Sequence, residues 1–257
     1  MASPHRLWLA AAGRRATMPS SEYGLGRLFD VEAKGTDAVE PSPARLGPNA
    51  IIQAGEVLSS RYGFGAASRI YEAAGLSRYI QTPPEALIDE REAQALFAAI
   101  RQALPAGEAD KVLSEAGSRT AQYILKNRIP KTARQILPLL PSAIASRALV
   151  SAISRHAWTF SGSGRFAARV RGWRHPVPTL VIAGNPLATP GCPWHGAVFK
   201  GLFEALTSAH VVIAHARCCG RGNALCEWVI KAEKPNRSRS PKLLEAADAR
   251  QDRAGHP

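Results

Sequence analysis

Residues 191–230 read GCPWHGAVFKGLFEALTSAHVVIAHARCCGRGNALCEWVI. This stretch holds four side chains at metal-ligand spacing: Cys192, His215, Cys218 and Cys226. Thiolate and imidazole are ligands that Zn²⁺ prefers, and three Cys with one His fill a tetrahedral site. Cys218 and Cys226 bracket the turn at 220–223, and Cys192 would tie the start of a helix to that hairpin. Four protein ligands close such a site, so a zinc ion held there is structural.

Other readings of these residues stay open at this point. Free cysteines are often packed as small hydrophobic side chains in protein cores. Cys219 could replace Cys218 as the ligand, and His195 is a rival imidazole. A disulfide is the third alternative, but nothing in the sequence suggests a small secreted scaffold.

The length of 257 residues suits one domain with an extension at each end. Residues 1–45 and 233–257 mix Ser, Pro, Gly and charges without hydrophobic periodicity, which predicts a disordered extension and a disordered basic tail. We therefore expect a single domain over residues 46–232, with the chemistry-bearing motifs in 155–232.

The first residues do not make a good signal peptide. The apolar stretch Leu7 to Ala12 is short, and Arg14 and Arg15 follow it rather than precede it. Met18 is an alternative start. No window approaches the roughly 20 apolar residues of a membrane span. We expect a soluble, cytoplasmic protein.

The net charge of +13 is concentrated in one region of the chain. Between Glu115 and Glu204 there is no Asp or Glu, although many cations are present. Such a field attracts anions: nucleic acid, an anionic membrane surface, an acidic protein or a small polycarboxylate. Because no nucleic-acid-reading motif is visible, we expect no nucleic-acid partner. The alternative is that these cations form a solvated basic face that only aids solubility. The cations are Arg119, Lys126, Arg128, Lys131, Arg134, Arg147, Arg155, Arg165, Arg169, Arg171, Arg174 and Lys200.

Hydrophobic spacing of three and four residues predicts helices over most of 51–152. Asp89, followed by Glu92, predicts the start of one of them. Pro130, Pro138 and Pro141 predict breaks or kinks. The expected helical segments are 51–63, 66–80, 89–104, 107–128 and 131–157.

The second half changes character. Residues 158–173 alternate and carry aromatics, and 178–184 is a short β-rich run. Residues 193–207 predict one amphipathic helix, and 210–218 with 225–232 predict an antiparallel hairpin. Helices come first and strands later, so the predicted fold class is α+β, a helical N-terminal half packed on a small antiparallel sheet.

One set of residues in this half resembles a known family. The set is Gly184-Asn185-Pro186, Gly191-Cys192, His195-Gly196, Gly201 to Leu206, Arg217-Cys218, Gly222-Asn223 and Cys226-Glu227-Trp228. It resembles the 4-vinyl reductase domain, and the region from Pro48 to Ala232 resembles the bacteriochlorophyll 4-vinyl reductase family. The helical part is the weaker match, and the two ends are not covered.

The resemblance implies a fold similar to haem–nitric-oxide-binding and TRAPP-type ligand-binding domains. In sensory relatives a structural zinc is held at positions matching Cys192, Cys218, Cys226 and His215. The last position is a carboxylate in some of them, so His215 departs in type. Cys219 stays the alternative to Cys218.

The resemblance also implies a role in bacteriochlorophyll biosynthesis, at the reduction of the 4-vinyl (8-vinyl) group of a chlorophyllide- or protoporphyrin-type tetrapyrrole. A reductase needs a reductant, here NADPH, ferredoxin or flavin, yet no dinucleotide-binding GxGxxG stands between a strand and a helix. The alternative is a non-catalytic carrier that hands pigment intermediates to other enzymes of the pathway. No residue can be assigned a catalytic role.

A tetrapyrrole offers a flat apolar face and carboxylates on its rim. Aromatic side chains can stack on the face, and arginines can pair with the carboxylates. His156 or His195 could coordinate a central Mg²⁺. The alternative is that these aromatics belong to the core. Further expected partners are a second copy of the chain and a membrane surface, contacted peripherally. The candidate pigment-binding residues are Arg155, Trp158, Phe160, Arg165, Phe166, Trp194, His195 and Phe199.

Overall fold

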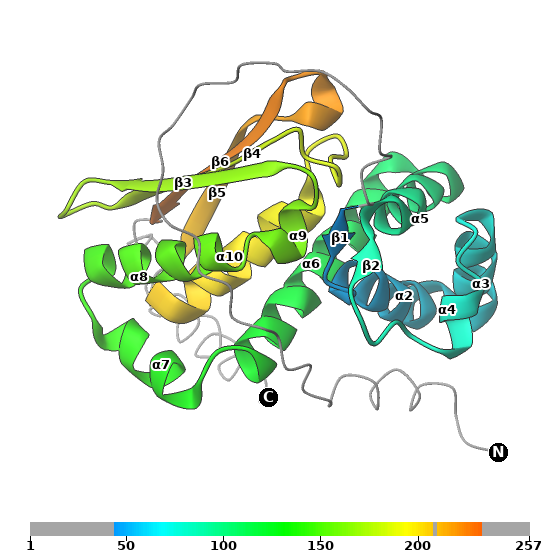
Figure 1. Cartoon of the computed structure of the whole chain (residues 1–257), viewed down its shortest axis with the longest axis horizontal. Helices are drawn as coiled ribbons and strands as arrows, with labels where there is room; N and C mark the ends of the chain where they lie inside the picture. Colours follow the sequence, from blue (N-terminus) through cyan, green and yellow to red (C-terminus); the bar gives the residue numbers. More distant parts are fainter. Residues whose placement is uncertain (1–43, 208–209, 233–257) are drawn as a thin grey trace, which may run out of the picture.

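The computed structural model describes residues 44–207 and 210–232 of the chain. The expectations for residues 1–43 and 233–257, and the choice between Met1 and Met18, lie outside the described residues. Figure 1 shows helices α2 to α5 on one side, a sheet on the other, and α6 leading from the first group to the second. The α+β class predicted from the sequence is confirmed.

The helical half begins with a two-residue strand pair that closes over the first helices. Strand β1 (Arg45–Leu46) pairs antiparallel with β2 (Ile88–Asp89). Asp89 is the N-cap of the next helix, as predicted, and its side chain accepts a 2.9 Å hydrogen bond from the Arg91 amide. The helices are α2 (Asn49–Tyr62), α3 (Phe64–Ala73), α4 (Arg78–Gln81), α5 (Glu90–Ala103) and α6 (Ala106–Asn127).

The predicted helix over 66–80 is two helices in the structure. Helix α3 ends at Ala73, and Gly75 has a φ of +69°, a conformation that turns the chain before α4 begins at Arg78. The Leu76 amide, which follows the turn, donates to the Tyr71 carbonyl at 2.8 Å. The glycine therefore ends the helix although the hydrophobic spacing continues past it.

Prolines divide the next segment as expected. Helix α7 (Lys131–Ile136) follows Pro130, a short 3-10 turn η3 (Leu137–Leu139) contains Pro138, and α8 (Ser142–Arg155) follows Pro141. Helix α9 (Trp158–Ser161) is a single turn where the alternating pattern predicts a strand. Gly162, with a φ of +53°, ends that turn and directs the chain into β3.

The sheet has four antiparallel strands in the order β3-β4-β6-β5. Between β4 and β5 the chain forms α10 (Pro193–Thr207), the predicted amphipathic helix. The predicted hairpin of β5 and β6 is confirmed, with a register shift between His215 and Arg217. The strands are β3 (Arg165–Arg171), β4 (Val177–Ala183), β5 (Val211–Arg217) and β6 (Leu225–Ala232).

Two glycines allow α6 and α10 to cross closely. A Cβ at Gly117 would collide with the Trp194 carbonyl, and one at Gly201 would lie 2.8 Å from the Ala121 Cβ. The crossing joins the helical half to the sheet half and fixes the start of α10. None of the described helices is long and apolar enough to cross a membrane.

Candidate metal centre and its surroundings

The four predicted metal ligands come together where the sheet meets the start of α10. Cys192 directly precedes α10, His215 lies on β5, Cys218 follows the end of β5, and Cys226 lies on β6. Their ligand atoms all lie within 4.8 Å of one another. Residues more than 30 positions apart in sequence thus meet at one point, as the hairpin and helix arrangement requires.

The sulfur positions suit a tetrahedral ion. The Sγ of Cys192 lies 3.7 Å from that of Cys218 and 3.5 Å from that of Cys226. A tetrahedron with Zn–S bonds of about 2.3 Å has S···S edges of about 3.8 Å. A disulfide needs about 2.05 Å, and all four cysteines are free.

The backbone at Cys192 is shaped to present its sulfur. Cys192 has a φ of +42°, a left-handed conformation that a non-glycine residue rarely adopts. Its amide donates to the Thr189 carbonyl at 2.8 Å, and Gly191 before it also has a positive φ. Pro193 then occupies the first position of α10, where no amide is needed. Strained backbone of this kind clusters at ligand sites.

The turn that carries Cys218 and Cys219 is closed by Asn223. The Cys218 amide donates to the Asn223 Oδ1 at 3.0 Å, and the Asn223 amide donates to the Cys218 carbonyl at 3.1 Å. Gly222 has a left-handed φ of +87° that completes the turn. These bonds hold Cys218 above the end of the hairpin.

Hydrogen-bond donors surround the Cys226 sulfur. The Cys219 amide donates to it at 3.2 Å and the Asn185 side-chain amide at 3.4 Å. Together with the Cys192 thiol, the first cause, and the nearby His215 ring, these donors lower the pKa of Cys226 to about 3. The same pairing raises the pKa of Cys192. Donors to sulfur stabilise a thiolate, the form that binds metal.

His215 is held by stacking rather than by hydrogen bonds. Its ring lies parallel to that of Trp228, with 5.0 Å between centroids and 6° between planes. Both of its ring nitrogens are buried and have no hydrogen-bond partner among the described residues. Buried polar atoms usually have a partner. A metal bound to one of these nitrogens would supply it, so the residues present fit a Cys₃His zinc site.

The two rival ligands lie elsewhere. Cys219 is half-buried and outside the group of four, and it contributes its backbone amide instead. His195 is buried in the core, with its Nε2 3.4 Å from the Phe160 carbonyl oxygen. Sequence reasoning did not identify Asn185 as a partner of the sulfurs, although it stands in the turn directly after β4.

Five of the eight candidate pigment-binding residues form one aromatic cluster. Phe160 touches Phe166 and Phe199 edge-on at 5.3 and 5.8 Å, and His195 packs against Trp194 at 4.9 Å. Trp194, His195 and Phe199 are buried, whereas Phe160 and Phe166 are half-buried. Burial lowers the pKa of His195 to about 4.

The other three candidates are exposed beside this cluster. Arg155 ends α8, Trp158 begins α9 and is 41% exposed, and Arg165 begins β3. The Arg155 guanidinium donates to the Ser151 hydroxyl at 3.3 Å, and neither arginine forms an ion pair within residues 44–207 and 210–232. His156, the other imidazole considered, is exposed and its Nδ1 lies 2.9 Å from the Ala152 carbonyl.

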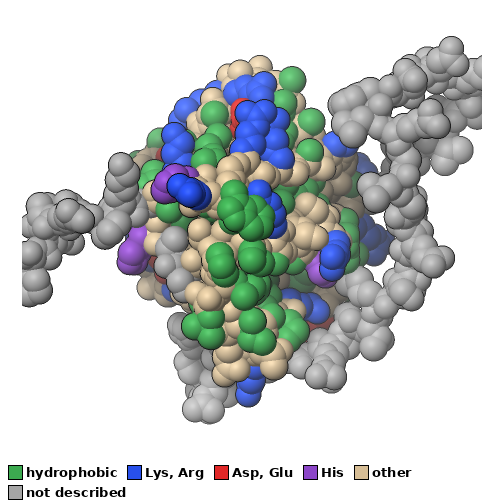
Figure 2. All heavy atoms as spheres, turned by 90° about the vertical axis from the view of Figure 1, so that its left-hand side faces the viewer, with side chains coloured by type: hydrophobic (Ala, Val, Ile, Leu, Met, Phe, Trp, Pro, Cys, Tyr) green, Lys and Arg blue, Asp and Glu red, His purple; other side chains and the backbone are tan. Residues whose placement is uncertain are grey.

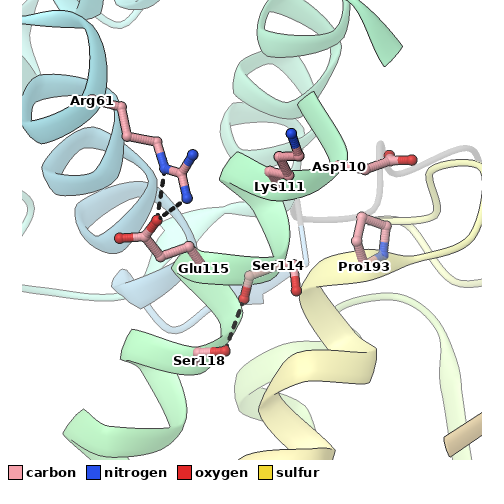
Figure 3. Close-up of a pocket in the computed structure, with 7 residues that line it drawn as sticks. All are labelled: Arg61, Asp110, Lys111, Ser114, Glu115, Ser118 and Pro193. Carbon is pink, nitrogen blue, oxygen red and sulfur yellow. Dashed lines mark hydrogen bonds and ion pairs between the residues drawn. The ribbon is translucent and has the colours of Figure 1, made fainter. Parts of the chain in front are cut away.

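A separate hollow of about 560 Å³ lies between α6, α2 and the start of α10. Figure 3 shows Arg61 on α2 paired with Glu115 on α6, and Pro193 at the start of α10 on the other side of α6. The pKa of Glu115 is lowered: burial opposes this, but the hydrogen bonds from Arg61 and Arg119 prevail. None of the metal ligands or pigment-binding residues predicted from the sequence lines this hollow.

Comparisons with known proteins place the fold and the family. No protein-family model matches the chain. Two solved H-NOX proteins, from K. algicida and S. oneidensis, each superpose with a TM-score of 0.50. The first is 12% identical and covers 74% of this chain and 97% of that chain; the second is 11% identical and covers 75% and 98%. This likeness agrees with the fold expected from the sequence.

Curated relatives are much closer in sequence. The bacteriochlorophyll synthase 23 kDa chain of Cereibacter sphaeroides is 40% identical over 188 residues, which cover 72% of this chain and 89% of the relative. The protein of the same name from Rhodobacter capsulatus is 37% identical, covering 75% and 90%. Neither name is that of a 4-vinyl reductase, so the family is shown at a coarser level than the motif resemblance implies. The chain belongs to the bacteriochlorophyll synthase 23 kDa chain family of bacteriochlorophyll biosynthesis proteins.

Proposed function

We propose that this protein binds a vinyl-bearing tetrapyrrole, of the chlorophyllide or protoporphyrin type, and serves the 4-vinyl (8-vinyl) reduction step of bacteriochlorophyll biosynthesis. The observation that carries the proposal is 40% identity to a bacteriochlorophyll synthase chain over 89% of that chain's length. The motif resemblance to 4-vinyl reductases supplies the step.

The proposed binding surface lies where α8, α9 and β3 meet. Trp158 presents an exposed ring for the flat face of the pigment, and the half-buried Phe160 and Phe166 lie on the same α9–β3 segment of the chain. Arg155 and Arg165 stand on the flanking elements and can pair bidentately with rim carboxylates. Trp194, His195 and Phe199 pack behind Phe160 and keep it in place.

In this proposal the four metal ligands hold structural zinc. The ion would join the start of α10 to the β5–β6 hairpin, and therefore keep the aromatic cluster in register with the sheet. With three sulfurs and one nitrogen its coordination is complete. The residues Cys192, His215, Cys218 and Cys226 thus act on stability rather than on the pigment.

A carrier is the role that this arrangement supports best. It needs only a surface that binds the pigment and releases it to other enzymes of the pathway. The second candidate is the reductase itself, with NADPH, ferredoxin or flavin as the external reductant, and the motif resemblance favours it. Both roles need the same binding surface.

The test is to titrate the full chain with divinyl chlorophyllide and to monitor binding by the absorbance of the pigment. We expect saturable binding that Trp158→Ala and Arg165→Glu each weaken about tenfold, since stacking and charge pairing contribute on the order of 1–3 kcal/mol. Trp173→Ala and Arg69→Glu are matched controls, because these exposed residues lie on other parts of the surface.

Two results would contradict the proposal. Absence of any absorbance shift would show that the protein does not bind the tetrapyrrole. Equal weakening by the control variants would show that the binding surface has been assigned wrongly. Loss of the vinyl group with the reductant as the sole addition would identify the protein as the reductase rather than a carrier.

A further inference from the structure

A group of large apolar side chains is exposed at the end of the molecule formed by the last residue of α7, η3, the start of α8 and the β3–β4 turn. Leu139 is 84% exposed, Trp173 64%, Ile136 54% and Ile144 41%. Figure 2 faces this end and shows hydrophobic side chains gathered through its middle and lower parts. Scattered exposed hydrophobics are ordinary, but a group at one end of a molecule indicates a contact surface.

The β3–β4 turn is held against α8. The Arg147 guanidinium lies 4.7 Å from the centre of the Trp173 ring and donates to the Gly172 carbonyl at 3.0 Å. Gly172 has a φ of +77°, and a Cβ there would collide with the His175 carbonyl. Trp173 is therefore presented at a fixed position beside the start of α8. We name Ile136, Leu139, Ile144 and Trp173 the apical patch.

Three exposed cations lie on the elements that carry the apical patch. Lys131 begins α7, and Arg171 and Arg174 flank Trp173; all three are exposed. None of them forms an ion pair with a carboxylate in the part of the chain that the structure describes. The cause lies in the sequence, which has no Asp or Glu between Glu115 and Glu204.

We propose that the apical patch docks the protein on an anionic lipid surface. Apolar and Trp side chains set among Lys and Arg suit the interface of a bilayer, where the apolar groups enter and the cations meet lipid phosphates. A nucleic acid would use the charge but would leave Leu139 and Ile136 in water, and an acidic protein is excluded only by the vesicle experiment below. The inference stands independently of pigment binding, because it uses different residues.

The test is co-sedimentation of the full chain with vesicles of phosphatidylglycerol and phosphatidylcholine. We expect binding that increases with the phosphatidylglycerol fraction and weakens between 0.05 and 0.5 M salt, as screening predicts. Leu139→Ser and Trp173→Ala each lower the partition coefficient about tenfold by removing apolar contact. Arg174→Gln lowers it about fivefold.

The matched controls lie on α3, at the other end of the molecule (Figure 1). Phe64 is 42% exposed there and Arg69 is exposed, so Phe64→Ser and Arg69→Gln remove similar groups from a different surface. We expect neither to change partitioning. Trp158→Ala should also bind vesicles normally, while Trp173→Ala should bind pigment normally.

Three results would overturn the inference. The first is absence of binding to phosphatidylglycerol vesicles at low salt. The second is equal loss of binding by the patch variants and the α3 controls. The third is self-association of the wild-type chain that Leu139→Ser abolishes while vesicle binding persists, because the patch would then join two copies. Since Leu139 is exposed, its substitution leaves the fold intact.

Discussion

The helical half and the sheet half of this molecule are stabilised by different kinds of contact. In the helical half, ion pairs cover an apolar core: Arg101 pairs with Asp110 at 2.6 Å, and Arg61 with Glu115 at 2.6 Å. In the sheet half, buried cysteines, imidazoles and aromatic rings lie between α10 and the strands. Almost every cation between β3 and α10 has no carboxylate nearby in sequence.

The two halves therefore depend on different groups for their stability. The helical half neutralises its own charges, and its surface pairs are largely exposed, so each contributes little. The sheet half instead depends on a few buried groups. Arg217 pairs with Glu227 and Lys200 with Glu204, but the arginines of β3 and of the β3–β4 turn form no ion pair among the described residues. Loss of one buried ligand should therefore matter far more than loss of one surface pair.

The largest expected effect is that of Cys226→Ser. Without this thiolate only two sulfurs and one nitrogen remain to bind zinc, and Cys192 is left buried without its partner. Binding of structural zinc is worth roughly 10–16 kcal/mol in zinc-finger peptides, and we expect on the order of 5 kcal/mol or more to be lost here. Chemical denaturation with and without a chelator measures it.

Cys219→Ser is the matched control for that experiment. Cys219 is adjacent to a ligand, but what it contributes to the group of four is its backbone amide, which serine retains. We expect zinc content and stability close to those of the wild type. If Cys219→Ser loses the metal while Cys218→Ser keeps it, the assignment of the ligands is wrong.

The next largest effect tests the crossing that joins the two halves. Gly117→Ala introduces a Cβ that collides with the Trp194 carbonyl and lies 2.9 Å from the Ala197 Cβ. The helices must separate, at a cost of about 1–3 kcal/mol. Gly107→Ala is the control in the same helix, because nothing lies within 4 Å of its Cβ position. A urea midpoint unchanged by Gly117→Ala would contradict the close crossing.

A third effect appears as acid sensitivity of the sheet half. Burial lowers the pKa of His195 from 6.5 to about 4, so the folded protein keeps this ring neutral while the unfolded chain protonates it below pH 6.5. The stability contribution is therefore present above pH 6.5 and falls as the pH drops from 6.5 to 4. Between pH 7 and 5 we expect a loss of about 2 kcal/mol.

The comparison of wild type with His195→Phe isolates this contribution from that of the metal ligands, which both proteins share. The variant should lose less stability than the wild type between pH 7 and 5, by about the same 2 kcal/mol. Identical pH dependence in the two proteins would show that burial of His195 does not govern acid sensitivity.

The smallest effect is expected in the helical half. Arg101→Gln removes a pair whose Asp110 side chain is 47% exposed, so it should cost less than about 1 kcal/mol and less still at 1 M salt. A double-mutant cycle with Asp110→Asn measures the pair. A coupling free energy between Arg101 and Asp110 as large as the stability lost in Cys226→Ser would contradict the proposed difference between the helical half and the sheet half.

Local patterns in the sequence identified most elements. The caps and prolines at Asp89, Pro130 and Pro141 predicted helix boundaries that the structure confirms. The split at Gly75 and the helical turn at 158–161 differ from prediction because a left-handed glycine and packing against the core override periodicity.

Ligand spacing in the sequence identified the four side chains that meet, although Cys219 and His195 stayed open as rivals until the structure placed them outside the group. It could not predict the role of Asn185 or the stacking of His215 on Trp228, because these contacts depend on strand register and on a shift between His215 and Arg217. It could not distinguish buried from exposed aromatics either. Trp194 and Phe199 lie on α10 and are buried in the core, whereas Trp158 is exposed.

Metal analysis of the purified full chain, with X-ray absorption at the zinc edge, shows directly whether Cys192, His215, Cys218 and Cys226 hold a zinc ion. We expect one zinc ion per chain, bound by three sulfurs at about 2.3 Å and one nitrogen at about 2.0–2.1 Å, and absent from Cys226→Ser. A wild-type chain that binds no zinc after refolding with excess metal would contradict it.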